Sequence, residues 1–459
     1  MAHSMVDFIG ALAGVAEKLP SVAKPAPRPT LYRRLLITGL ALLTYFVMAN
    51  IPLYGIPEQQ IGGELNLLRI IFASSAGTIM ELGIGPIVTA SLILQILVGA
   101  KIIDLDLTVP ENRKKFTGAQ KTLAIVFAFL EATAFALGKR YWAGTGIEPT
   151  YYDLAIVALQ LAFGAIIVLY LDELVQKGWG IGSAISLFIL AGVAQGVAWS
   201  FFGYVPGVVA FGLLPSMIEE GNLLMFARPN AYPDITGALA TVSMVLLLAY
   251  LQSMRVEIPV ASQRFRGIRS RVPLQFLYVT NIPILLVGIL IADLQLIQGL
   301  LADFLGRDNA FYKVYSDVLY YLTPPRGIIE ASLDPIRTLT FAISWLVLSI
   351  AFGLLWVEIA GLGPKEQAEK LVKSGLEIPG FRRNPKAVEM ELSQYIYPLA
   401  VLSSIIVAFI VITSDILGVY GTGTGLLLSV GIVNQYYALI LRERALEAYP
   451  LIKRILGEE

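Results

Sequence analysis

The chain has 459 residues, of which 56% are hydrophobic and only 15% are charged, and its 34 basic residues balance its 34 acidic ones. Soluble globular domains carry about 25% charged residues, so this composition excludes that class and indicates an integral membrane protein. Cysteine is absent from the sequence, which excludes disulfides, thiol catalysis and thiolate metal sites.

The N-terminal segment predicts a helix that lies along the membrane interface. Apolar residues recur at helical spacing between residues 5 and 19. No Lys or Arg precedes the apolar stretch "FIGALAGVA", so a cleavable signal peptide is not expected. The proline-rich stretch "KPAPRP" then ends the helix.

Ten apolar windows follow, each long enough to cross ~30 Å of hydrocarbon at ~1.5 Å per residue. Their apolar runs are continuous rather than alternating, which favours helices over a β-barrel. The sequence therefore predicts an all-α, polytopic membrane protein with ten transmembrane helices. The windows are residues 35–53, 77–99, 119–138, 153–171, 181–201, 236–254, 273–292, 337–357, 395–413 and 423–440.

Basic residues alternate between two classes of connecting segment. Of the 34, 26 fall in the N-terminal segment, the C-terminal tail and every second loop, which by the positive-inside rule places both termini in the cytosol. Ten spans make two sets of five. Because each set has an odd number of spans, a second set that repeated the first would have the opposite orientation in the membrane. The expected division is 1–34 (cytosolic segment with the interfacial helix), 35–215 (spans 1 to 5), 216–441 (spans 6 to 10, with cytosolic loops 255–271 and 358–394) and 442–459 (cytosolic tail).

Between the first two spans, residues 65–73 form a candidate apolar helix that follows a Gly-Gly hinge and is too short to cross the membrane. Two interpretations stay open from composition alone. The helix either packs on the outer rim of the protein, or re-enters the membrane and fills a cavity in which protein shields it from lipid.

The second span, "ELGIGPIVTASLILQILVGAKII", has an unfavourable start. Gly83, Gly85 and Pro86 would destabilise a helix interior, by about 1 kcal/mol per glycine and more for proline, but cost less at a helix start. We therefore expect the helix to begin near Pro86, inside the protein. The fifth span opens similarly with "GWGIGSAIS" and the tenth with "GTGTGLLLS". Such glycines allow close helix packing, and three of these starts together suggest a common central cavity.

Few ionisable residues lie within the spans, which disfavours an ion-coupled pump. Glu131 in the third span is the clearest, and we expect it to be a hydrogen-bonded structural group near the surface rather than a proton relay. The single histidine, His3, lies in the N-terminal tail. No P-loop, metal-ligand cluster or nucleophile–base arrangement is visible in the sequence, so we expect no enzyme, no cofactor and no metal site.

The cytosolic loops are rich in basic residues. The stretch "RVEIPVASQRFRGIRSR" carries five arginines in 17 residues, and loop 358–394 carries six basic residues with a helical pattern of its own. These charges either serve orientation and lipid headgroup binding, or dock a large anionic partner, since clustered arginine suits phosphate contact. The residues alone leave both interpretations open.

Several motifs together resemble the SecY family, which forms the channel of the Sec protein translocon, in its archaeal and eukaryotic-like form. They are "LGIGPIVTASLILQILVG", "IPVASQRFRGIRSRVPLQFLYVTNIPILL", "GLGPKE" with "PGFRR", and "GTGTGLLLSV". The resemblance covers nearly the whole chain. It implies ten helices in two pseudo-symmetric inverted halves of five that open like a clamshell, together with a short re-entrant plug helix.

The resemblance also implies roles for particular side chains. The plug would lie at about residues 61–75 and comprise Leu65, Leu67, Leu68, Ile70, Ile71 and Phe72. A constriction of six apolar side chains carries over to Ile84, Val88, Ile185, Ile189, Leu285 and Leu428. Such a ring offers no specific hydrogen bonds, and a narrow apolar ring dewets and resists ions when no chain occupies it. This chain departs from the family at "GTGTG", where an all-glycine run is expected, and at Leu285, where isoleucine is expected.

Spans 2, 3, 7 and 8 resemble the lateral gate of the family, where signal sequences intercalate. Family positions that contact the ribosome carry over to Arg264, Arg266, Arg269 and Arg382. The partners implied are a SecE/gamma subunit and a small beta subunit, the ribosome or another cytosolic motor, signal peptides and nascent polypeptides, and membrane lipid. The location implied is the cell (plasma) membrane; DNA binding is not expected, and the basic loops suit contact with ribosomal RNA.

The sequence and the family resemblance leave three functions to compare. The first is a passive protein-conducting channel that depends on a partner for energy. The second is a secondary transporter for a small solute, which would also have inverted halves and broken helices. The third is an insertase or scaffold without an aqueous pore. Scarce intramembrane charge and large arginine-rich loops favour the channel.

Overall fold

The protein is a long helical bundle, as the sequence predicts. Among the described residues, nine helices are long and apolar enough to cross a membrane, and a tenth apolar helix is shorter. All ten predicted spans correspond to helices, so the prediction of a helical, multi-pass membrane protein is confirmed. The computed structural model describes residues 2–27, 29–57, 77–99, 102–103, 105, 109–142, 147–204, 211–222, 225–226, 228, 232–262, 269–279, 282–325, 327–373, 376–377 and 385–448.

The first half of the chain supplies the interfacial helix and the first five spans. In chain order the elements are α1 (Ala2–Lys18), α2 (Leu31–Met48), α4 (Gly85–Gly99), α5 (Pro110–Leu137), the 3₁₀ turn η2 (Arg140–Trp142), α6 (Tyr151–Leu174), the π-helical turn η3 (Val175–Trp179) and α7 (Ala184–Phe202). Several starts have familiar caps: Pro110 opens α5, and Thr150 with Asp153 forms a capping box at α6.

The second half supplies the other five spans and the connecting elements at both ends of the bundle. In chain order these are α8 (Leu213–Glu220), α9 (Ile235–Ser253), β1 (Arg255–Ser262), β2 (Arg269–Gln275), α10 (Ile282–Leu305), α11 (Ala310–Leu322), α12 (Ile328–Leu333), α13 (Pro335–Ile359), α14 (Pro364–Lys373), β3 (Leu376–Glu377), α15 (Pro385–Ile416) and α16 (Gly423–Ala448).

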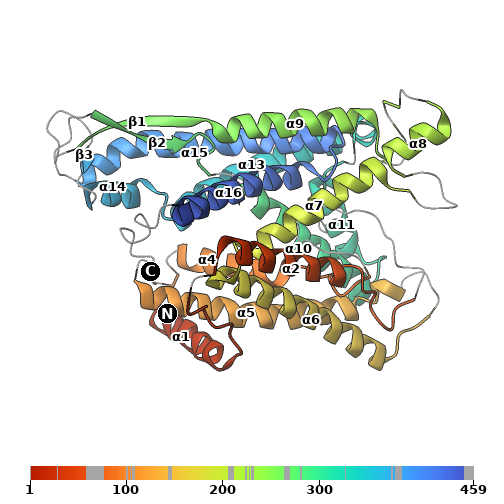
Figure 1. Ribbon diagram of the computed structural model, residues 1–459. Helices are drawn as coiled ribbons and strands as arrows, with labels where there is room; N and C mark the ends of the chain where they lie inside the picture. The colour runs from red at the N-terminus through yellow and green to blue at the C-terminus, as the bar shows by residue number, and fades with distance from the viewer. Residues whose placement is uncertain are drawn as a thin grey trace.

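Figure 1 shows α9, α13 and α15 on one side of the bundle and α5 and α6 on the other. Helices α7 and α10 link the two sides, since α7 contacts α16 and α10 contacts α5. Figure 1 also shows α1, α14 and the β1–β2 hairpin toward one end of the bundle and α8 toward the other. The described parts of the basic segments predicted to be cytosolic therefore lie toward one end.

A small antiparallel sheet with strand order β2-β1-β3 extends from that end. Ala261 of β1 pairs with Arg269 of β2, and Arg255 pairs with Gln275. The strands β1 and β2 lie largely within the predicted loop 255–271, whereas the predicted start of a span at residue 273 is wrong. The apolar residues after 271 continue a strand, and α10 begins only at Ile282, because a short apolar run does not by itself distinguish a strand from a helix.

The first predicted span, 35–53, also ends too late. Helix α2 stops at Met48, and the following residues pair with the segment before α4: Ile79 N donates to the carbonyl oxygen of Ile51 at 3.1 Å, and Leu53 N donates to that of Gly77 at 2.9 Å. Backbone pairing across the bundle, rather than hydropathy, sets this boundary.

Helix α1 confirms the predicted N-terminal helix and packs across the start of α5. Ile9 is fully buried in an apolar cluster with Leu94 and Phe116. The Thr122 hydroxyl of α5 donates to the carbonyl oxygen of Leu12 at 2.9 Å. The helix is therefore held against the end of the bundle by both apolar and polar contacts.

The largest apolar cluster joins helices of both halves. It includes Tyr45 of α2, which stacks on Phe188 of α7 with ring centroids 4.8 Å apart, and Trp345 of α13. Lipid is as apolar as these side chains, so helices in a membrane associate mainly through close packing and hydrogen bonds rather than hydrophobic burial. Small residues at helix contacts matter accordingly.

Gly164 of α6 is such a small residue, and it packs against the segment that precedes α4. A Cβ atom at Gly164 would lie 2.2 Å from the carbonyl oxygen of Ile79, which is backbone and cannot turn aside. By contrast, a Cβ atom at Gly39, in the middle of α2, would meet no other atom within 4 Å. The pair offers a matched test of packing.

We predict that Gly164→Ala lowers the thermal unfolding midpoint of the purified protein in detergent, because overpacking typically costs ~1–3 kcal/mol. Gly39→Ala should leave the midpoint unchanged or raise it slightly, since alanine favours a helix by up to ~1 kcal/mol over glycine. Equal midpoints for the two variants would contradict the packing described here.

Candidate functional site

The start of the second span is not helical. Helix α4 begins at Gly85, as predicted from Pro86, and has 15 residues. At 1.5 Å per residue it covers ~22 Å, less than the ~30 Å of a bilayer core. The segment 77–84 therefore covers the remaining depth without being a helix.

Segment 77–84 is held by partners within the protein. In addition to the two backbone bonds to residues 51 and 53, the buried carboxylate of Glu81 accepts a hydrogen bond from Gly77 N. Gly83 has φ +53°, in the left-handed region that favours glycine. The chain thereby turns into α4 with Ile84 fully buried.

The start of α7, the fifth span, is organised by a carboxylate from the end of α6. Asp172 accepts hydrogen bonds from Ser183 Oγ at 2.9 Å and from Ile185 N at 3.2 Å. The Tyr436 hydroxyl of α16 donates to the carbonyl oxygen of Ser183 at 2.6 Å. Gly182, at φ +71°, leaves the room that the Tyr436 ring occupies, since a Cβ there would lie 2.8 Å from it. The two halves of the chain therefore meet at this helix start.

The start of α16, the tenth span, follows the same plan. Asp415, at the end of α15, accepts a hydrogen bond from Gly423 N at 3.0 Å. Thr422 adopts φ +63°, which is uncommon for a residue other than glycine, and its hydroxyl accepts a hydrogen bond from Gly425 N at 3.1 Å. The departure of "GTGTG" from an all-glycine run thus adds a capping hydroxyl to the turn.

Sequence reasoning missed the roles of Asp172 and Asp415. Each stands close before a glycine-rich helix start, which is a readable signal. An acidic side chain near a helix N-terminus accepts its free N–H groups and interacts favourably with the helix dipole.

The six predicted ring residues lie in the large apolar cluster that joins the two halves. Ile84, Ile189 and Leu428 are buried in it, with 0%, 7% and 5% of their surface exposed. The other three, Val88, Ile185 and Leu285, are partly buried and pack against it. The cluster also holds ordinary packing residues such as Tyr45, so it brings the six together without singling them out.

Two hollows open at opposite ends of the bundle. One, of about 990 Å³, lies at the α1 end and is lined by Ile87 and Ile185 together with charged residues such as Lys121 and Glu173. The other, of about 330 Å³, is lined by Gly196 and Ile291 among others. On α7, Ile185 and Gly196 are 11 residues apart, roughly 16 Å. Ile189 lies between them.

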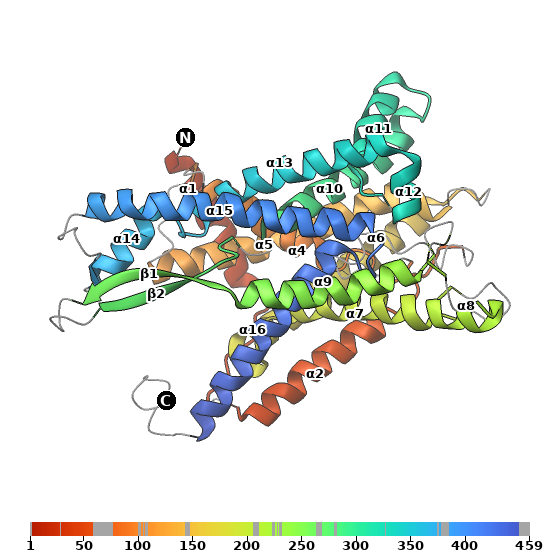
Figure 2. The same ribbon diagram turned by 90° about the horizontal axis from the view of Figure 1, so that it is seen from above.

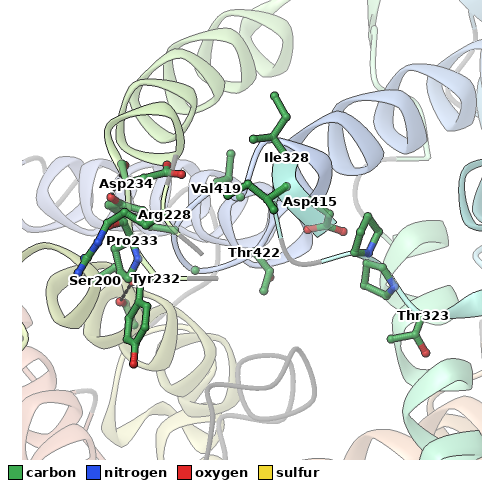
Figure 3. Close-up of a pocket in the computed structure, with 18 of the residues that line it drawn as sticks. Ser200, Arg228, Tyr232, Pro233, Asp234, Thr323, Ile328, Asp415, Val419 and Thr422 are labelled. Carbon is green, nitrogen blue, oxygen red and sulfur yellow. Dashed lines mark hydrogen bonds between the residues drawn. The ribbon is translucent and has the colours of Figure 1, made fainter. Parts of the chain in front are cut away.

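The smaller hollow has several polar and charged residues among its mostly apolar lining. Figure 3 shows Arg228, Asp234 and Ser200 on one side of it and Asp415 and Thr323 on the other. Arg228 donates to the carbonyl oxygen of Pro233 at 3.2 Å. Burial raises the pKa of the Asp234 carboxyl above its usual value, although the hydrogen bond from Gly237 N and the nearby Arg228 act in the opposite direction.

Helices of the two halves also meet along the predicted lateral gate. Helix α4 contacts α13, and α5 contacts α10. Glu131 of α5 is partly buried there, beside Thr89 of α4 and near Asp293 of α10. The Glu131 carboxylate therefore faces neighbouring helices. From the sequence alone we expected it near the surface of the protein.

The predicted plug and docking residues lie mostly outside the part of the chain that the structure describes. All six plug residues, Leu65 to Phe72, lie outside the described residues, as do Arg264, Arg266 and Arg382. Arg269 is the first residue of β2. Their predicted roles therefore stay predictions.

Comparison with known proteins gives the family. The SecY family model matches residues 78–437, and the model of the plug domain of Sec61p matches residues 43–77. The protein translocase subunit SecY of Aeropyrum pernix is 65% identical over 99% of this chain and 100% of its own length. That of Methanocaldococcus jannaschii is 38% identical over 97% of this chain and 99% of its own.

Solved structures agree. A protein-conducting channel is 38% identical, has a TM-score of 0.78 and covers 94% of this chain and 97% of its own. Sec61 in the canine ribosome–channel complex from the endoplasmic reticulum is 36% identical, has a TM-score of 0.75 and covers the same shares. The chain belongs to the SecY family.

Proposed function

We propose that the chain is a passive protein-conducting channel rather than an enzyme. It translocates secretory polypeptides across the membrane and releases transmembrane segments sideways into lipid. The observation that carries the proposal is the position of Ile189, with Ile84 and Leu428, in one apolar cluster between hollows at opposite ends of the bundle.

An apolar waist suits this task physically. Aliphatic side chains form no specific hydrogen bonds, so they do not retain any one passing side chain. A narrow apolar constriction also loses its water and resists ions when it is vacant. The proposal assigns this seal to Ile84, Val88, Ile185, Ile189, Leu285 and Leu428. It assigns the plug to residues 61–75, which lie outside the described residues.

Sideways release occurs where α4 and α5 meet α10 and α13. A sufficiently apolar segment gains ~25 cal/mol per Å² of apolar surface on leaving a wet cavity for lipid. Each segment is thereby sorted by its own hydrophobicity. The two halves, 35–215 and 216–441, separate to open this route.

The surroundings of the channel follow from its charge and its relatives. By the positive-inside rule the basic segments favour a cytosolic α1 end and cytosolic termini, and we propose that the membrane is the plasma membrane. The hairpin β1–β2 and the loop after α14 dock the ribosome or another motor that supplies the energy. SecE/gamma and beta subunits complete the assembly.

We predict that Ile84→Asn or Ile189→Asn raises the resting ion conductance of the reconstituted channel several-fold and relaxes signal-sequence selection, because a polar group wets the constriction. Leu246→Asn is the control: Leu246 lies on α9 with 66% of its surface exposed, toward lipid. Resting conductance that stays at the level of the unmodified protein in both ring variants would exclude the seal.

We predict that Arg266→Glu weakens ribosome binding by about tenfold or more, because a hydrogen bond to a charged group contributes about 1.5–3 kcal/mol and the reversal adds repulsion. Binding of purified ribosomes to proteoliposomes measures the effect. Arg307→Glu, at the exposed turn between α10 and α11 at the opposite end, is the matched control. Equal affinities for both variants would remove the hairpin from the docking surface.

A further inference from the structure

Helix α11, between the seventh and eighth spans, presents three different faces. One packs on the bundle, with Leu319 only 4% exposed. A second is polar and exposed and carries Lys313 and Asp317. The third is apolar and exposed: Phe311, Val314, Val318 and Tyr321 have 61%, 63%, 57% and 41% of their surface accessible. We call these four residues the α11 apolar face.

The helix is fastened to α10. The Tyr315 hydroxyl donates to the carbonyl oxygen of Leu294 at 2.8 Å, and Gln298 Nε2 donates to Ser316 Oγ at 2.9 Å. Both bonds come from the packed side of α11. They leave the α11 apolar face free.

The helix is fastened equally to α13. Trp345 Nε1 donates to the carbonyl oxygen of Leu322 at 2.9 Å, and Arg337 Nε donates to that of Tyr320 at 3.2 Å. The Arg337 guanidinium also lies over the Tyr320 ring, 4.2 Å from its centroid, and pairs with Glu330. Helix α11 is therefore rigidly attached to two of the helices assigned to the gate.

Its position is at the level where α10 leaves the membrane. The stretch of α10 that is long and apolar enough to span a membrane includes Ile282 to Ala302, and α11 begins at Ala310, after a four-residue turn that reaches at most ~14 Å. Figure 2 shows α11 running across the ends of α10 and α13 and projecting beyond the bundle. It lies crosswise to the spans.

Large apolar side chains are also exposed on the adjoining ends of the two helices to which α11 is fastened. Phe304 at the end of α10 is 73% exposed, and Ile336 and Leu339 at the start of α13 are 68% and 61% exposed. Amphipathic helices with a distinct polar side and large apolar residues lie in the plane of the interface, and tyrosines favour this depth. These features fit a lipid surface better than a protein partner as the occupant of the α11 apolar face.

We propose that α11 is an interfacial helix whose apolar face is embedded at the boundary of headgroups and acyl chains, in the lipid leaflet at the end of the bundle opposite the β1–β2 hairpin. Because α11 is hydrogen-bonded to α10 and α13, the contact ties both helices to that leaflet. The roles of α10 and α13 as gate helices, and of this leaflet as the outer one, rest on the proposed function.

The absence of cysteine makes a direct test available. Single cysteines at Val314→Cys and Val318→Cys are labelled with an environment-sensitive fluorophore, and the purified full chain is reconstituted in phosphatidylcholine vesicles. The proposal predicts blue-shifted emission, strong quenching by phosphatidylcholine spin-labelled near the top of its acyl chain, and weak quenching by aqueous iodide.

Lys313→Cys and Asp317→Cys are matched controls on the polar face of the same helix, and iodide should quench them several-fold more strongly than the first pair. Iodide quenching that is equal at all four positions would overturn the proposal. Protection of positions 314 and 318 from both quenchers would overturn it too, because protein would then cover the face. The assay needs no translocation, so its failure is separate from failure of the proposed channel function.

Discussion

A backbone N–H or C=O group that leaves a helix inside a bilayer must find a partner within the protein. Three of the spans begin irregularly, and at each start an acidic side chain supplies such a partner. Glu81 accepts from Gly77 N, Asp172 from Ile185 N, and Asp415 from Gly423 N. A carboxyl oxygen accepts such a bond whether the group is charged or neutral, so each acid gives a partner to an N–H group that would otherwise be unpaired within the bilayer.

The same helix starts carry four residues of the proposed apolar waist. Ile84 directly precedes α4, Ile185 and Ile189 lie in the first turns of α7, and Leu428 lies in the second turn of α16. All four belong to or pack against the large apolar cluster that joins the two halves. The irregular starts and the proposed waist are therefore close together along the chain.

The same features relate the two halves. Asp172 precedes the fifth span and Asp415 precedes the tenth, at opposite ends of the bundle. Proline stands in the first turn of the second span, as Pro86, and of the seventh, as Pro283. In a chain of two inverted sets of five spans, these positions correspond. They support the division at about residue 215, which stays a prediction.

Hydropathy and charge predicted much of the architecture, because the ten spans are long and continuously apolar, and Gly83 to Pro86 correctly placed the start of α4. The strand β2 and the helix α11 are among the elements that escaped. The strand β2 escaped because its apolar residues run into α10 without a break in hydropathy. Helix α11 escaped because it lies in a connection between spans, where windows sized for a membrane crossing do not register a 13-residue helix.

The candidate ring could be proposed only from the family resemblance. Aliphatic residues at i, i+4 spacing are ordinary in membrane helices. The sequence pattern therefore does not distinguish a ring residue such as Ile189 from an ordinary packing residue such as its neighbour Phe188. What distinguishes them is the convergence of separate helices in space, which no single window of sequence contains.

The most direct measurement is the contact between a translocating chain and this waist. A secretory polypeptide with one cysteine is stalled in the channel, and disulfide formation is measured with single cysteines at Val88 and Ile189, and at Leu43 and Leu246, which are exposed on the outer surface of α2 and α9. The account predicts efficient cross-linking at 88 and 189 and background levels at 43 and 246. Equal cross-linking at all four positions, or none at 88 and 189, would contradict it.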